Sequence, residues 1–134
     1  MPSFYSLKAL YKGEEVSFEK FRNQLYQKYH QGLAVIAFPC NQFGNQEPFS
    51  NEEIRKFAFE KYHATFPIFD KIDVNGPNAS PVYSYLKRAS HTGDIEWNYV
   101  KFLVSPQGKV LRFAPWTDPL QLEPHIRAWL GFTE

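Results

Sequence analysis

A run of six apolar residues, Leu-Ala-Val-Ile-Ala-Phe at 33–38, constrains the fold of this chain more than any other feature. The run is short, contains β-branched side chains and is closed by Pro39, so it predicts a strand rather than a helix. A strand that is apolar on both faces belongs inside a sheet covered on both sides. The chain must therefore supply helices for both faces of that sheet.

Helical patterns lie on both sides of the run. Apolar residues at spacings of three and four predict one helix over 18–31: Phe18, Phe21, Leu25 and Tyr29. Ser50 and Glu53 form a capping box that predicts a second helix. The apolar face expected for this second helix consists of Ile54, Phe57, Ala58 and Tyr62.

Ser80-Pro81 and Asp118-Pro119 each predict a further helix with proline at its first position. The side chains expected to face inward from the last helix are Leu122, Ile126, Trp129 and Leu130.

Two turns that contain glycine predict β-hairpins. The first joins residues 4–10 to 15–17, and the second joins 99–104 to 109–113 through Ser-Pro-Gln-Gly. Residues 66–72 are expected to be extended. Strands that alternate with helices predict an α/β fold with a mixed central sheet flanked by helices and an N-terminal hairpin. A length of 134 residues predicts a single domain over 1–134.

Charge and hydropathy exclude several partners. Fifteen Lys and Arg stand against fourteen Asp and Glu, and a net charge of +1 gives no reason to expect a nucleic acid or an anionic membrane. No apolar stretch approaches the roughly 20 residues of a membrane span. The first residues lack the basic-then-apolar order of a signal peptide, so the expected location is cytoplasmic.

The segment 38–48, Phe-Pro-Cys-Asn-Gln-Phe-Gly-Asn-Gln-Glu-Pro, is the first candidate site. It follows the predicted buried strand and contains four amide side chains, and sites in α/β proteins gather at such strand ends. Neutral amide donors can stabilise a developing anion. The alternative is that these amides only hold the backbone of their own loop.

Trp97 and Asn98 form the second candidate site, because an indole and an amide donor stand side by side before a strand. Neighbours in a strand face opposite ways, so both can serve one site only at a bend or in a loop. The alternative is a core tryptophan beside a turn asparagine.

Cys40 is the one cysteine of the chain, which excludes an intrachain disulfide and a CxxC pair. No basic residue flanks it to depress its pKa, so it is expected to be a small buried hydrophobic residue rather than a nucleophile. The four histidines lie about thirty residues apart without metal-ligand spacing, and no metal is expected.

Four stretches of the chain together resemble the glutathione peroxidases, thioredoxin-fold enzymes that reduce hydroperoxides. They are the Phe-Tyr-Ser-Leu at 4–7, the segment 38–48, the Thr-Phe-Pro-Ile-Phe-Asp-Lys-Ile-Asp-Val-Asn-Gly at 65–76 and the Trp-Asn-Tyr-Val-Lys-Phe-Leu-Val at 97–104. The resemblance implies a thioredoxin-like fold and a hydroperoxide substrate. It also implies glutathione or thioredoxin as the reducing co-substrate, with no bound cofactor.

In that family a peroxidatic cysteine or selenocysteine attacks the peroxide, and a Gln, a Trp and an Asn hold its anionic form. Carried over by motif, these three are Gln46, Trp97 and Asn98. Three neutral donors around a thiolate lower its pKa, which agrees with the chemistry expected of the amide loop.

The resemblance also implies that this chain lacks part of the family pattern. The inner strand and the loop with the peroxidatic residue are expected between Asn23 and Gln24, where the family pattern is interrupted. Cys40 matches a family cysteine that is not the peroxidatic one. Ala58 stands where thioredoxin-dependent members carry a resolving cysteine. The short connection 90–96 is similar to that of monomeric members.

Three functional hypotheses follow. The complete form would be a hydroperoxide reductase, and the chain as written would have little or no turnover. Alternatively, the chain is a non-catalytic, thioredoxin-like binding or regulatory remnant. The third hypothesis is a defective product without a function of its own.

Overall fold

A computed structural model describes residues 4–18, 35–45, 47–63, 66–105 and 107–129. From residue 19 onward, the helix expected over 18–31 lies outside the described residues. The junction between Asn23 and Gln24, and Gln46, lie outside them too.

The chain begins with a 3-10 turn, η1 (Phe4–Ser6), followed by β1 (Lys8–Tyr11) and β2 (Glu14–Ser17). The two strands pair antiparallel, with Lys8 opposite Ser17. Their turn has positive φ at Lys12 (52°) and Gly13 (81°), the geometry that matches the twist of a tight hairpin. The predicted N-terminal hairpin is confirmed, although Phe4–Ser6 is helical rather than extended.

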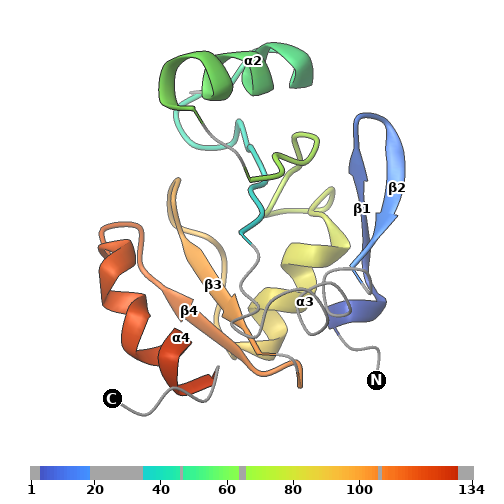
Figure 1. Cartoon of the computed structure of the whole chain (residues 1–134). Helices are drawn as coiled ribbons and strands as arrows, with labels where there is room; N and C mark the ends of the chain where they lie inside the picture. Colours follow the sequence, from blue (N-terminus) through green and yellow to red (C-terminus); the bar gives the residue numbers. More distant parts are fainter. Residues whose placement is uncertain (1–3, 19–34, 46, 64–65, 106, 130–134) are drawn as a thin grey trace.

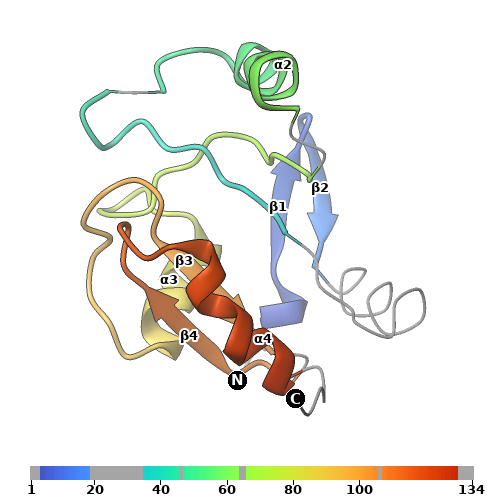
Figure 2. The same cartoon turned by 60° about the vertical axis from the view of Figure 1, so that its left-hand side comes forward.

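The second predicted hairpin is also confirmed, as β3 (Lys101–Val104) and β4 (Val110–Phe113). In both views, α3 (Pro81–Ala89) and α4 (Glu123–Trp129) lie on opposite sides of this hairpin (Figures 1 and 2). Ring contacts fix the layers: Tyr83 to Phe102 at 5.8 Å and Phe113 to His125 at 5.4 Å between centroids. On the last helical segment, Leu122 is buried and Ile126 and Trp129 are half-buried, while Leu130 lies outside the described residues.

The predicted helix starts are confirmed. Ser50 and Glu53 form the capping box of α2 (Asn51–Tyr62). The Ser80 hydroxyl accepts from the Val82 amide at 3.2 Å at the start of α3. Asp118 caps the 3-10 turn η2 (Pro119–Leu122), which leads into α4. Each signal is local, because the capping side chain bonds the next few residues of its own chain.

The expectation of a strand buried on both faces at 33–38 is wrong for the described part of that run. Of residues 35–38, Ala37 forms an isolated parallel bridge with Ile68, and Val35 is 51% exposed. The bridge rests on the Ala37 amide donating to the Pro67 carbonyl (3.0 Å) and the Phe69 amide donating to the Ala37 carbonyl (2.8 Å). The apolar composition of a segment indicates that its side chains can be buried, but it does not determine which strands lie beside the segment.

Strand pairing within the described residues consists of two separate antiparallel hairpins and isolated parallel bridges. The directions are mixed, as expected, and helices flank the strands, so the α/β class is confirmed. The pairs do not join into one continuous sheet there.

The apolar face predicted for α2 is wrong in most of its members. Ile54 is the buried residue of this helix, whereas Phe57 is 56% and Tyr62 is 67% exposed. Their rings pack on one another at 5.8 Å, and the Lys61 ammonium lies over both. In both views α2 lies at the upper edge of the molecule (Figures 1 and 2).

The core consists of two clusters that share Tyr83 and Phe102 as flanking residues. The buried members of the larger cluster are Phe4, Tyr5, Phe18, Phe69, Val82, Leu86 and Val110. The buried members of the smaller cluster are Cys40, Phe43, Val74 and Ile95. The smaller cluster therefore draws on the amide loop and on the segment just before Trp97.

Candidate active site

The amide loop, residues 38–48, is held by its own side chains. The Asn41 side-chain oxygen accepts from the Glu47 amide at 2.9 Å and closes the loop. Between Asn41 and Glu47, the chain turns at Gly44 and Asn45, which both have a positive φ (67° and 51°). At the C-terminal end of the loop, the Lys71 ammonium donates to the Glu47 carbonyl (2.9 Å) and the Phe49 carbonyl (2.8 Å).

Gln42 joins the amide loop to residues 74 and 75. Its side-chain oxygen accepts from the Val74 amide at 2.7 Å and the Asn75 amide at 3.1 Å. Its side-chain nitrogen donates to the Asn75 carbonyl at 2.9 Å. Asn41 therefore holds the backbone of its own loop, as the alternative interpretation expected, whereas Gln42 bonds the backbone of another segment.

Trp97 and Asn98 lie in a turn before β3, which meets the condition for both to face one site. The Trp97 ring packs on Phe43 of the amide loop at 5.7 Å between centroids and is 45% exposed. Asn98 is half-buried. The structure thus brings the Trp97–Asn98 turn against the amide loop that contains Gln46.

Arg112 of β4 fixes the segment that precedes this turn. Its guanidinium donates to the Thr92 hydroxyl (2.8 Å), the Gly93 carbonyl (2.7 Å) and the Asp94 carbonyl (3.0 Å). It also pairs with the Glu96 carboxylate at 2.7 Å. A planar guanidinium with several donors suits this task, because it holds several acceptors in one fixed geometry.

Cys40 lies in the smaller core cluster and is 7% exposed. Its thiol donates to the Gln42 side-chain oxygen at 3.4 Å. Burial raises the pKa of Cys40 above its ordinary value of 9.0, and the nearby Asp73 carboxylate adds to this, against smaller opposing hydrogen bonds. The expected buried, unreactive character of this cysteine agrees with that environment. Ala58 lies half-buried in α2.

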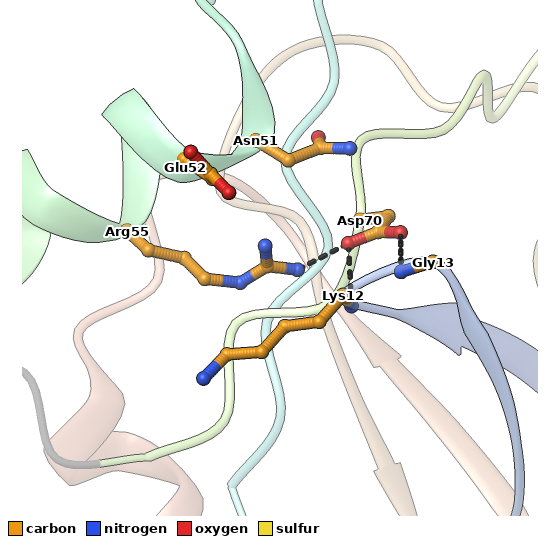
Figure 3. A pocket seen from close by; sticks show the side chains of 6 residues that line it. All are labelled: Lys12, Gly13, Asn51, Glu52, Arg55 and Asp70. Carbon is orange, nitrogen blue, oxygen red and sulfur yellow. Dashed lines mark hydrogen bonds and ion pairs between the residues drawn. The ribbon is translucent and has the colours of Figure 1, made fainter.

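The structure also contains a pocket that the sequence did not indicate, with a volume of about 540 Å³ (Figure 3). It lies between the β1–β2 turn, the first turn of α2 and Asp70, and is lined by Lys12, Gly13, Asn51, Glu52, Arg55 and Asp70. Asp70 accepts from the amides of Lys12 (3.0 Å) and Gly13 (2.9 Å) and pairs with Arg55. Since Arg55 also donates to the Ile68 carbonyl, these charges are engaged in joining three segments.

Among the residues that the structure describes, no group of His, Cys, Asp and Glu could hold a metal ion. Over the same residues, no helix is both long and apolar enough to cross a membrane.

This α/β chain, in which the amide loop meets a Trp-Asn turn, aligns with solved structures of thioredoxin-like fold. The crystal structure of Trgpx in apo form aligns with 98% of this chain and 97% of its own, at a TM-score of 0.74 and 26% identity. The family model described as "Glutathione peroxidase" matches residues 9–87. The chain belongs to the glutathione peroxidase family, and the thioredoxin-like fold expected from the resemblance is confirmed.

Two plant relatives illustrate the match. One is the "Probable phospholipid hydroperoxide glutathione peroxidase" of Mesembryanthemum crystallinum, 54% identical over 113 residues, which cover 81% of this chain and 66% of the relative. The other is the "Phospholipid hydroperoxide glutathione peroxidase, chloroplastic" of Pisum sativum, 55% identical over 114 residues, 81% of this chain and 48% of the relative. The chain therefore spans from about half to about two thirds of the length of such relatives.

Proposed function

We propose that this chain retains the amide and indole side of a site for reducing hydroperoxides. The observation that carries the proposal is the contact of Trp97 with Phe43, which lies in the same loop as Gln46. Relatives about 54% identical are named phospholipid hydroperoxide glutathione peroxidases, which supports hydroperoxides as the substrate class. Gln46, Trp97 and Asn98 would orient the peroxidatic residue and stabilise its anion.

In the complete form, the peroxidatic thiolate or selenolate would attack the terminal oxygen of a hydroperoxide. A bond from sulfur or selenium to that oxygen forms, the O–O bond breaks, and the remainder takes a proton and leaves as an alcohol. Two equivalents of thiol, from glutathione or thioredoxin, would then reduce the sulfenic or selenenic acid, giving a disulfide and water. Neutral donors suit this step, because they stabilise the anion without titrating themselves.

For the chain as written, we propose little or no turnover. The family segment with the peroxidatic residue is missing between Asn23 and Gln24, and Ala58 offers no resolving thiol. The thiol that remains, Cys40, is buried with a raised pKa. At pH 7 a thiol with a pKa above 9.0 is less than about 1% thiolate, which is the reactive form.

A peroxide-consumption assay with glutathione or thioredoxin tests this proposal. We expect no rate above the blank for the chain, and turnover once a relative's segment is inserted between Asn23 and Gln24. In the restored form, Trp97→Phe and Asn98→Ala should each lower kcat, by up to about a hundredfold, as loss of a hydrogen-bond donor to an anion does. Asn78→Ala, an exposed amide in another segment, is the matched control. Turnover of the unmodified chain that Cys40→Ser abolishes would contradict the assignment of Cys40.

A second candidate function, a non-catalytic binding or regulatory module, is favoured by the environment of Cys40. We expect the folded chain to react slowly with a thiol reagent such as DTNB and to resist peroxide, and both reactions to become fast in urea. Rapid peroxide oxidation of Cys40 in the native state would count against a non-catalytic module.

We further propose that the protein acts in a reducing compartment, the cytosol, as a monomer built as one domain. The short connection 90–96 supports the monomer, as it resembles that of monomeric family members. Some relatives are named as mitochondrial or chloroplastic proteins. Cell fractionation is therefore the decisive measurement for the compartment. Light scattering after size-exclusion chromatography measures the oligomeric state.

A further inference from the structure

The amide loop and the Trp97–Asn98 turn are joined through a third segment, residues 74–75. Gln42 makes the first connection: its side chain both accepts from the Asn75 amide (3.1 Å) and donates to the Asn75 carbonyl (2.9 Å). One amide side chain thus pairs with both backbone groups of one residue. This fixes the position of residue 75 relative to the amide loop in two directions at once.

Asn75 repeats the arrangement one step further along. Its side-chain nitrogen donates to the Ile95 carbonyl at 2.8 Å, and its side-chain oxygen accepts from the Ile95 amide at 2.8 Å. Ile95 is 5% exposed and belongs to the smaller core cluster, so its backbone groups need such partners. Lys87 also donates to the Asn75 side chain, at 3.3 Å, and to the Val74 carbonyl, at 2.6 Å.

We propose that Asn75 is a positioning residue for the hydroperoxide site, because it holds the Trp97–Asn98 turn against the amide loop by way of Gln42 and Ile95. We call Gln42 and Asn75 the amide pair. Ile95 stands two residues before Trp97, so a displacement of Ile95 is transmitted to the Trp97 contact with Phe43 through a short stretch of chain. The inference rests on the proposed function, since the placing of Trp97 and Asn98 is what the amide pair would serve.

The chemistry explains why asparagine stands at this position. A carboxylate of the same shape keeps the acceptor for the Ile95 amide but cannot donate to the Ile95 carbonyl. An aliphatic side chain loses both bonds and leaves the two backbone groups of a buried residue without these partners. The effects of Asn75→Asp and Asn75→Ala should therefore be graded in that order.

The exposure of Trp97 tests the inference without any activity. Trp116→Phe and Trp129→Phe in the full chain leave Trp97 as the fluorescent tryptophan, and acrylamide quenching then measures its accessibility. We expect Asn75→Ala to raise the quenching constant toward about twofold, the ceiling for a side chain that starts 45% exposed. Asn75→Asp should raise it less. Gln42→Ala, which breaks the other half of the amide pair, should also raise it.

Asn78→Ala is the matched control, because this exposed amide lies three residues further along the same segment. An unchanged constant in both Asn75→Ala and Gln42→Ala overturns the inference, as does an equal rise in Asn78→Ala. Should Asn75→Ala fail to fold by circular dichroism, Asn75→Asp and Gln42→Ala decide by the same criterion. Failure of the proposed function gives a different result, namely a restored form that consumes no peroxide although the quenching order holds.

Discussion

At Asp70, one nearly buried carboxylate receives donors from two other segments of the chain. Burial by itself would raise the pKa of Asp70, but the Arg55 guanidinium and the amides of Gly13 and Lys12 outweigh it and hold this pKa below its ordinary value of 3.8. A carboxyl group whose pKa is lower in the folded state than in the unfolded state stabilises the folded state. This stabilisation is fully present at pH values above the pKa of the unfolded state. The contribution disappears as the pH falls through the folded value.

We therefore expect Asp70→Asn to lower the free energy of unfolding at pH 7 by about 1–3 kcal/mol, the usual loss for a buried charged hydrogen-bond partner. The difference from the unmodified chain should close as the pH falls below 3.8. Urea unfolding at a series of pH values measures it. Asp94→Asn is the control, because that carboxylate is 79% exposed opposite Lys87 and should matter little. A loss that stays constant down to low pH would contradict the assignment.

Single residues differ in how far the sequence reveals their roles. Trp97 and Asn98 could be proposed as site residues from the sequence, because their two hydrogen-bond donors are adjacent in the chain. Asn75 could not, since its partners Gln42 and Ile95 are 33 and 20 positions away and offer only backbone or amide groups. The pairing of Arg55 with Asp70 escaped prediction for the same reason: only the fold brings them together.

Among the elements, α2 and α3 start with the same kind of cap but differ in what they bury. Ser50 caps α2, which buries Ile54, and Ser80 caps α3, which buries Val82 and Leu86 in the larger core cluster. A lost cap costs about 1 kcal/mol in either helix. The structural consequence should differ, because a helix with little buried surface can fray without the core.

We expect Ser50→Ala to speed amide hydrogen exchange within α2 and to lower the global unfolding midpoint less than Ser80→Ala does. Ser80→Ala should lower that midpoint, because α3 unfolds together with the core. Hydrogen exchange by mass spectrometry and thermal unfolding measure the two effects. Equal shifts of the midpoint in both variants would show that α2 is as firmly coupled to the core as α3.

The sequence predicted where elements begin better than what surrounds them. Caps at Ser50, Ser80 and Asp118 depend on atoms within a few residues, so their signal is complete in the local sequence. Burial depends on partners from elsewhere in the chain. Val35 and Phe57 are apolar and were expected inside, yet the described structure places no covering layer over them.

For the molecule as a whole, Tyr83 and Phe102 connect the two core clusters, because they flank both of them. Tyr83 packs edge-on against Phe38 at 5.9 Å and Phe102 at 5.8 Å, and flanks both clusters. Burial raises the pKa of Tyr83 to about 12, so the phenol stays neutral in this packing at ordinary pH. Cooperative unfolding should depend on this ring.

We expect Tyr83→Ala to lower the free energy of unfolding by about 3 kcal/mol or more, as loss of a packed aromatic ring does. Tyr83→Phe keeps the ring and should cost far less. Far-ultraviolet circular dichroism and tryptophan fluorescence should give coincident thermal transitions in the unmodified chain. Two separate transitions in that chain would mean that the clusters unfold independently.

Class and family could be recognised from sequence, because the matching stretches 38–48, 65–76 and 97–104 lie in order along the chain. The discontinuity of strand pairing could not. The run 33–38 has the composition of an inner strand, but composition does not determine which strands pair with it, and within the described residues Ala37 pairs only in an isolated bridge with Ile68.

The outward aromatic rings of α2 bear on how the protein behaves in concentrated solution. Phe57, Phe59 and Tyr62 are each more than half exposed, while the net charge is only +1 and the isoelectric point lies near 7.8. Electrostatic repulsion between molecules is therefore weakest close to neutral pH, where these rings are free to meet. Colloidal stability should improve as the buffer is moved well below pH 7.8, and crystallisation trials near neutrality should favour contacts through this helix.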